Sequence, residues 1–318
     1  MRYLVLGLLA WLSASSPILA EDFPNRSIRI VVPTGAGGIT DVLARFVGTK
    51  LSQATGQTVV IDNRSSTGGI AGSDYVARSA PDGYTLLFAF PSHTINAALF
   101  TKLPYDTVGS FAPVTMVSSF PAVLEVTPKF PAETLRGVIE LAKSTSYPLN
   151  YASLGNGSLA FLSAALFAQE AHVPLVQVPY KDVPQAAAAL QSGDVDMFFD
   201  TPVTALPLMH AGNVRALGVT SERRLATMPD VPTIGEVIPG YTARGWNGVL
   251  APRGTPDDVI ERLNHLIVGI LQTPDTQREL AAMGVQVIGD TPEQFGAAIK
   301  ADIAKWSALI ERLGIQPE

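Results

Sequence analysis

Short hydrophobic runs alternate with amphipathic segments along most of the chain. In the first third, residues 28–32, 58–61 and 84–88 have the length and composition of β-strands. The segments between them, residues 41–53 and 70–79, carry hydrophobic residues at the spacing of an α-helix. Strands and helices that alternate in this way predict βαβ units and a parallel sheet with right-handed crossovers.

A second series of the same kind follows in the middle of the chain. We predict strands at residues 150–152, 175–178, 195–199 and 214–219, with helices at residues 159–170, 184–191 and 204–210. Two longer apolar stretches, residues 112–126 and 246–251, separate the two series. We interpret them as the strands where the chain crosses from one lobe to the other and returns. The sequence therefore predicts an α/β protein with two lobes, each a mostly parallel sheet flanked by helices.

The C-terminal part carries the clearest helix signals. Residues 255–258 (Thr-Pro-Asp-Asp) place an N-cap, a proline and two acids where a helix begins, and this predicts a helix to residue 271. Residues 291–293 repeat the design. A single apolar stripe then follows up to Gly314, made of Phe295, Ile299, Ile303, Trp306, Ile310 and Leu313. Such a stripe is typical of a helix that packs on a core.

Residues 1–20 have the features of a secretory signal peptide. Arg2 gives a positive start, residues 4–12 form an apolar run too short to span a bilayer, and small residues lead to Ala20. Pro17 opposes a continuing helix, which favours cleavage after Ala20 over a retained anchor or a buried first helix. The predicted mature lobes are residues 21–121 with 248–318, and residues 122–247.

The amino-acid composition excludes some kinds of function and argues against others. The chain has no cysteine, which excludes disulfides, thiolate catalysis and thiolate metal sites. Its net charge of −6 argues against nucleic acid as a partner, because nucleic-acid binding needs a basic surface. The same charge means that an anionic ligand must be attracted by local dipoles.

Glycine-rich segments follow the first two predicted strands. Residues 33–41 read Pro-Thr-Gly-Ala-Gly-Gly-Ile-Thr-Asp, and residues 65–69 read Ser-Ser-Thr-Gly-Gly. Each leads into a helix whose first N–H groups are free to bind an anion. The carboxyl ends of neighbouring parallel strands meet at one edge of a sheet, so we expect the two segments to converge on one ligand. The alternative is two ordinary turns.

Further polar residues occupy equivalent positions later in the chain. A third glycine-rich segment, residues 153–158, precedes a predicted helix and can supply donors from the second lobe, although simple capping also explains it. His93 follows the third strand and is either a ligand contact or part of a surface turn. Asp200 ends another strand, where it can bind a cationic or hydroxyl group or cap the next helix.

Catalytic alternatives have weaker support. Gly35, Gly37 and Asp62 imitate a dinucleotide fingerprint, but Thr40 stands where that pattern needs a small residue. The histidines are scattered without metal-ligand spacing, and no nucleophile elbow, zinc-protease motif or P-loop is present. We therefore predict no catalytic residue, metal site or cofactor, while a periplasmic enzyme that uses Asp200 or His93 as a base, or a ligand sensor for a membrane kinase, stays an alternative.

Many short motifs, in order over residues 23–315, resemble the Bordetella-type uptake (Bug) family of periplasmic solute receptors from tripartite tricarboxylate transporters. The main carriers are residues 30–33 with 37–38 and 41, 60–64 with 68–69, 80–87, 149–153, 178–181, 193–196, 215–220 and 229–233. The resemblance implies a two-lobed, type II-like periplasmic binding protein with hinge strands between its lobes. The two glycine-rich segments of the first lobe differ from the usual family pattern, so the identity of the ligand is the least transferable property.

The resemblance also implies a function and a set of contacts. The protein would be a periplasmic monomer that captures a small organic acid for inner-membrane permease subunits, with aromatic acids and dicarboxylates among the candidate ligands. Carried onto matching positions, the resemblance implies ligand contacts from Thr34, Gly35, Ala36, Gly37, Gly38, Thr67, Gly68, Gly69, Asn156, Gly157, Ser158, Asp200 and Thr201. From the residues themselves we also expect contacts from Ser92, His93, Thr94 and Tyr180.

Overall fold

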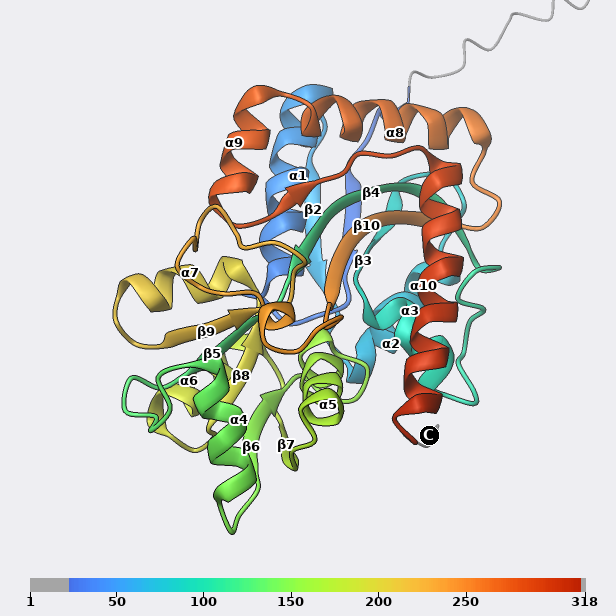
Figure 1. Ribbon diagram of the computed structural model, residues 1–318. Coiled ribbons are helices and arrows are strands. Elements are labelled where there is room, and N and C mark those ends of the chain that lie inside the picture. The colour runs from blue at the N-terminus through green and yellow to red at the C-terminus, as the bar shows by residue number, and fades with distance from the viewer. Residues whose placement is uncertain (1–22, 316–318) are drawn as a thin grey trace, which may run out of the picture.

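Two β-sheets, each flanked by helices, form the two lobes of the chain (Figure 1). The computed structural model describes residues 23–315, so the predicted signal peptide lies outside the described residues. In spatial order, the first sheet contains β11 (Gln286–Val287), β4 (Phe111–Pro121), β10 (Arg244–Pro252), β3 (Thr85–Ala89), β1 (Ile28–Val32) and β2 (Val59–Asn63). The second contains β7 (Leu175–Pro179), β6 (Leu149–Ser153), β8 (Met197–Asp200), β5 (Val123–Val126) and β9 (Arg215–Val219). The predicted two-lobed α/β architecture is confirmed.

Both sheets are mixed, with a parallel half and an antiparallel half. The predicted βαβ units account for the parallel pairs β2–β1–β3 and β7–β6–β8. Strands β10, β4 and β11 are joined by antiparallel pairs, as are β8, β5 and β9. The antiparallel pairs arise because β4, β5 and β10 carry the chain between the lobes and back.

The two crossings lie side by side and are joined by one buried residue. The chain passes from β4 to β5 at Ala122, and it returns just before β10 at Ala243. Thr220 donates its amide to the Ala122 carbonyl at 2.9 Å and accepts the Ala122 amide on its hydroxyl at 2.7 Å. Its carbonyl accepts the Ala243 amide at 3.0 Å. All of β10 belongs to the first sheet, so the sheet boundary lies before Arg244, a few residues ahead of the predicted division at 247/248.

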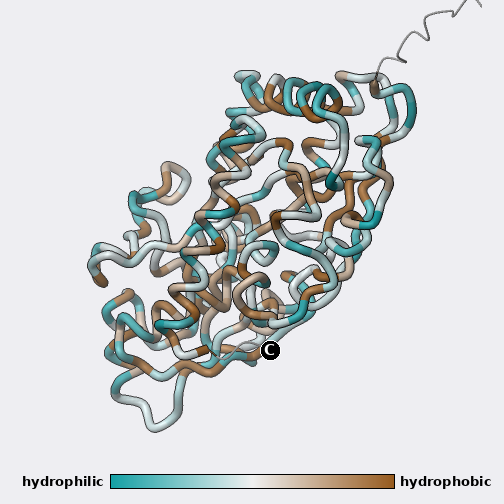
Figure 2. The backbone as a smooth tube through the Cα atoms, turned by 90° about the vertical axis from the view of Figure 1, so that its right-hand side faces the viewer, coloured by the Kyte–Doolittle hydropathy of each residue, from teal (hydrophilic) through white to brown (hydrophobic). Residues whose placement is uncertain are grey.

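Helices cover both faces of each sheet. The first lobe contains α1 (Ile39–Thr55), α2 (Ile70–Ala77), α3 (Ser92–Leu99), α8 (Asp257–Leu271), α9 (Pro274–Ala282) and α10 (Pro292–Arg312). The second contains α4 (Leu135–Ser144), α5 (Leu159–Ala171), α6 (Val183–Ser192) and α7 (Pro202–His210). Figure 2 shows hydrophobic segments through the interior and hydrophilic stretches on the outer helices. Within residues 23–315, no helix has both the length and the hydrophobicity needed to cross a membrane.

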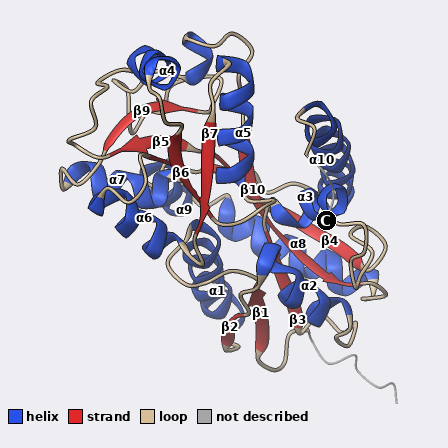
Figure 3. Ribbon diagram, turned by 90° about the horizontal axis from the view of Figure 1, so that it is seen from below, coloured by secondary structure: helices blue, strands red, loops and turns tan. Residues whose placement is uncertain are grey.

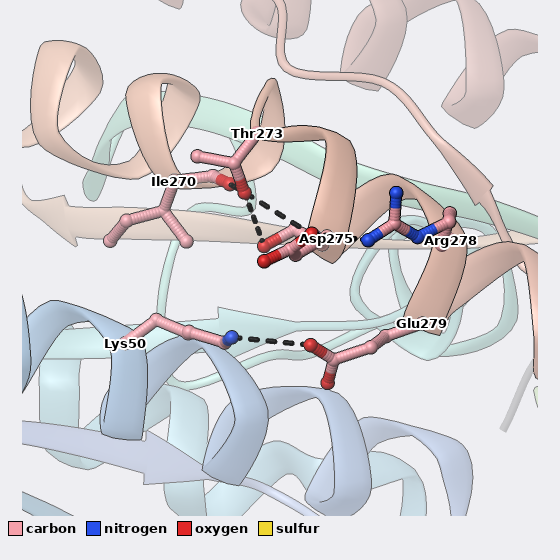
Figure 4. Close-up of polar contacts among 7 residues, drawn as sticks. Lys50, Ile270, Thr273, Asp275, Arg278 and Glu279 are labelled. Carbon is pink, nitrogen blue, oxygen red and sulfur yellow. Dashed lines mark hydrogen bonds and ion pairs between the residues drawn. The ribbon is translucent and has the colours of Figure 1, made fainter.

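At the end of the first lobe that points away from the second lobe, helices that are distant in the sequence contact each other. Lys50 on α1 lies 3.2 Å from a carboxylate oxygen of Glu279 on α9 (Figure 4). Thr273 caps α9, because its hydroxyl accepts the Thr276 amide at 3.3 Å. These surface contacts orient α9, while the buried side chains of α1 and α8 supply the core beneath them.

Helix α10 contacts both lobes. In Figure 1 it runs from the top of the first lobe down to the level of α5. Phe295 and Ile299, near its start, are buried with side chains of the first sheet. Trp306 and Ile310, near its end, belong to the hydrophobic cluster of the second lobe. The side chain of Arg312 also lies 3.2 Å from Glu170 at the end of α5. The predicted apolar stripe of α10 therefore packs against the cores of both lobes.

Candidate functional site

A cavity of about 120 Å³ lies between the lobes, at the carboxyl ends of the parallel strands. Figure 3 shows the second-lobe sheet at upper left and the first-lobe sheet at lower right. Six helices begin at this cavity, because their N-cap residues all line it: Gly38, Gly69, Pro91, Ser158, Asp182 and Thr201. Each helix N-terminus carries a partial positive charge, and N–H groups remain available beyond those that side chains cap at α5 and α6. The cavity is therefore built to hold an anion with dipoles rather than with cationic side chains.

The first glycine-rich loop is shaped around Asp41. Gly37 adopts a φ of +89° and donates its amide to an Asp41 carboxylate oxygen at 3.1 Å. Burial alone would raise the pKa of Asp41, but hydrogen bonds from Arg45, Asn63 and Gly37 hold the pKa below its ordinary value. Asp41 therefore stays charged and fixes the loop, and Gly38 begins α1 without a side-chain cap that would occupy the helix amides.

This loop also touches the opposite lobe. A Cβ atom on Gly35 would lie 3.2 Å from Cβ of Asp182, and one on Gly38 would lie 3.3 Å from a methyl group of Val183. Both contacts lie at the N-terminus of α6 in the second lobe. The absence of side chains at these positions therefore lets the lobes close on each other.

The second loop approaches the cavity through close packing inside the first lobe. Gly68 and Gly69 have φ values of +59° and +72°, which favour glycine. The Asn96 side chain donates to the Gly68 carbonyl at 2.8 Å, and a Cβ on Gly69 would lie 2.8 Å from the Phe90 ring. These two glycines therefore place the start of α2 beside the cavity.

The loop between β6 and α5 forms part of the second-lobe wall and contacts α3 across the cleft. Ser92 donates its hydroxyl to the Gly157 carbonyl at 2.8 Å, which joins the two lobes directly. Ser158 caps α5, because its hydroxyl accepts the Phe161 amide at 3.1 Å and donates to the Gly155 carbonyl at 2.9 Å. Capping and cavity lining thus both apply to Ser158.

Charged side chains are few around the cavity. Asp200 at the end of β8 is 2% exposed, and burial raises its pKa to about 7. Among the described residues that line the cavity, Lys181 is the one cation, and it is exposed at the mouth. The remaining lining is largely aromatic and aliphatic, which suits the carbon chain of a small acid.

Nine of the predicted site residues line the cavity: Thr34, Gly35, Gly38, Gly68, Gly69, Ser92, Ser158, Asp200 and Thr201. The other eight do not: Ala36, Gly37, Thr67, His93, Thr94, Asn156, Gly157 and Tyr180. Of these eight, Gly37 and Gly157 act through the backbone contacts described above.

His93 and Thr94 require a correction, because both side chains are buried within the first lobe. The His93 ring lies 3.0 Å from the Thr107 carbonyl and stacks on Tyr105 at 6.0 Å. Burial lowers the pKa of His93 to about 4, so the ring is neutral at physiological pH. Thr94 donates to Asp302 of α10 at 2.6 Å, so these residues anchor helices instead of facing the cavity.

Several lining residues were absent from the predicted set. The polar ones are Thr40, Ser65, Ser66, Lys181 and Asp182, and the apolar ones are Ile39, Phe90, Pro91, Phe120, Leu154, Leu159, Ala160, Val183, Phe198 and Phe199, with Pro33 at the start of the first loop. Lys181 and Asp182 follow a parallel strand, so the rule that identified the glycine loops could have found them. The aromatic residues carry no such signal, because they occupy strand ends and turns that read as core.

Comparisons with known proteins extend over both lobes. A family model described as "Tripartite tricarboxylate transporter family receptor" matches residues 43–315. Protein BugT of Bordetella pertussis is 33% identical over 314 residues, which span 98% of this chain and 96% of BugT. A solved structure of an R. palustris protein with adipate is 33% identical, covers 93% of this chain and 100% of its own, and has a TM-score of 0.91. MatC from Rhodopseudomonas palustris with bound malate is 32% identical over 91% of this chain and 100% of MatC, with a TM-score of 0.85.

Proposed function

The chain belongs to the family of tripartite tricarboxylate transporter receptors, and on that premise we propose that it captures a small carboxylate between its lobes for inner-membrane permease subunits. One observation carries this proposal, namely the convergence of six helix N-termini on a single cavity. The adipate and malate in the two similar structures are aliphatic acids of matching chemistry. We propose export to the periplasm, where the protein acts as a monomer without altering its ligand.

The ligand carboxylate is proposed to lie against the amides at the start of α1 and the neighbouring glycine loop. Gly38 and Thr40 line the cavity there, and no side-chain cap competes for the first amides of α1. A carboxylate at such a position accepts charge-assisted hydrogen bonds without a cationic side chain. The net charge of −6 fits this arrangement, because attraction is then confined to the cavity.

Lobe closure is proposed to transmit binding to the permease. The contacts of Gly35 with Asp182 and of Ser92 with Gly157 exist only when the lobes meet. A ligand that touches both walls binds the closed state more tightly and shifts the population toward it. The closed surface is then the form that the permease recognises.

Thermal-shift and calorimetric titrations with aliphatic mono- and dicarboxylates test the proposal. Gly38→Val should remove ligand stabilisation, because its methyl groups would enter the space between α1 and Val183. Gly269→Val is the matched control, since a Cβ at that position on α8 meets nothing within 4 Å. Unchanged affinity in Gly38→Val would exclude the first loop from the site. Chemical conversion of the acid would show an enzyme instead of a receptor.

A further inference from the structure

Two buried carboxyl groups lie in the second-lobe sheet beside the cavity. Asp200 on β8 pairs with Val123 on β5, and Glu125 pairs with Phe198. In an antiparallel pair, Asp200 and Glu125 are therefore diagonal neighbours on the same face of the sheet. Glu125 is 0% exposed, whereas Asp200 lines the cavity and is 2% exposed.

Their hydrogen bonds differ. One oxygen of Asp200, Oδ1, accepts the Thr201 amide at 2.7 Å. The nearby Thr204 side chain also lowers the pKa of this carboxyl group, but its hydroxyl donates to the Thr201 carbonyl at 3.2 Å. The other oxygen, Oδ2, has no hydrogen-bond partner among the described residues, and neither oxygen of Glu125 has one. A buried carboxyl oxygen is strongly disfavoured without a partner, so Oδ2 is complementary to a donor that arrives in the cavity.

The surroundings decide which of the two acids holds a proton. Two neighbouring buried carboxyls cannot both ionise, and burial raises the pKa of Glu125 well above its usual value. Asp200 accepts the Thr201 amide and stands at the N-terminus of α7, both of which favour its charged form. Glu125 lacks such donors and holds its proton more tightly, so above a pH of about 7 Asp200 is the charged member of the pair.

No cation in the described chain neutralises Asp200 from the elements packed around it. Helix α6 contains no charged residue, and α7 carries only His210 in its last turn. Arg215 on β9 donates to the carbonyls of Phe130 and Ala132. Lys181 and Asp182 stand together at the cavity mouth, where Lys181 is exposed.

We propose that Asp200 Oδ2 binds a hydrogen-bond donor on the ligand, so that the preferred ligands are carboxylates with a hydroxyl or ammonium substituent. This inference rests on the proposed carboxylate-receptor function. Gly38 and Asp200 line the same small cavity, so one short ligand can place its carboxylate at α1 and its donor at Asp200. A second ionised carboxylate at Asp200 would meet an uncompensated like charge.

Matched ligand pairs test the inference on the unmodified protein. Isothermal titration calorimetry at pH 7.5 would compare malate with succinate, and 3-hydroxybutyrate and 3-aminobutyrate with butyrate. We expect the substituted acid of at least one pair to bind tenfold or more tightly than its parent. Equal or weaker binding of every substituted acid overturns the inference but leaves the receptor function intact. Failure of every carboxylate to bind would instead remove the receptor function.

Asp200→Asn gives an independent measurement. The amide keeps the size and the bond to the Thr201 amide but loses the charged acceptor. We expect the preference for the substituted acid to fall at least fivefold, with a smaller change for the parent acid. Glu133→Gln is the matched control, because Glu133 is an exposed acid of the same lobe. Above pH 7.5, where the free Asp200 is charged, a parent dicarboxylate whose affinity rises tenfold per pH unit on acidification would show proton uptake at Asp200 and overturn the inference.

Discussion

Glu125 shows how a single buried acid makes stability depend on pH. Its pKa and that of Asp200 are raised by burial, so the folded state holds protons that the unfolded state releases. The contribution of Asp200 to stability is therefore greatest at acidic pH. It is lost as the pH rises through about 7, where the folded protein releases the Asp200 proton. His93 acts in the opposite sense, but only between about 4 and 6.5, because its folded pKa is lowered.

Glu125→Gln should make the ligand-free protein less sensitive to alkaline pH. Between pH 6.5 and 8.5 the slope of unfolding free energy against pH should flatten by up to about 1.4 kcal/mol per pH unit, the value for one proton. Urea unfolding at a series of pH values measures this slope. Glu133→Gln should leave it unchanged, and an identical slope in Glu125→Gln would mean that Glu125 is ionised in the folded protein.

Single residues also mark the limit of sequence-based prediction. The glycines of the first two loops were predictable, because their positions after parallel strands define where amides gather. Glu125 was not, because one acid in the apolar stretch 112–126 gives no indication that it is fully buried. His93 was misplaced because its partners Tyr105 and Phe111 lie on later segments that fold back over it.

Among the helices and strands, α10 shows most clearly which packing partners the sequence could not predict. Its amphipathic stripe predicted a buried face but could not reveal that Trp306 packs with the second lobe while Phe295 packs with the first.

Trp306→Ala should lower the free energy of unfolding by about 3–5 kcal/mol, as for other large buried side chains. Chemical denaturation measures the loss. Ser307→Ala on the exposed face is the control, and a loss below about 1 kcal/mol in Trp306→Ala would mean that this end of α10 is loosely docked.

For the whole molecule, function depends on the balance between open and closed lobes, and Ser92 is a direct test of that balance. Its hydroxyl donates to the Gly157 carbonyl of the other lobe at 2.8 Å, so Ser92→Ala removes a direct bond between the lobes, which we propose belongs to the closed form. A net hydrogen bond contributes about 0.5–1.5 kcal/mol, which predicts a two- to tenfold weaker affinity for the carboxylate. Titration calorimetry measures the affinity, and small-angle scattering measures whether saturating ligand still closes the lobes.

Ser79→Ala separates closure from a general loss of stability. Ser79 makes a comparable bond to the Tyr75 carbonyl at 2.8 Å, but entirely within the first lobe, so its removal should leave affinity unchanged. If both variants weakened binding equally, the Ser92 effect would reflect stability and not closure. If Ser92→Ala bound normally, the glycine-lined contacts with α6 would be sufficient to hold the lobes together. The predicted outcome, a defect confined to Ser92→Ala, requires that ligand and interlobe contacts stabilise the same closed state.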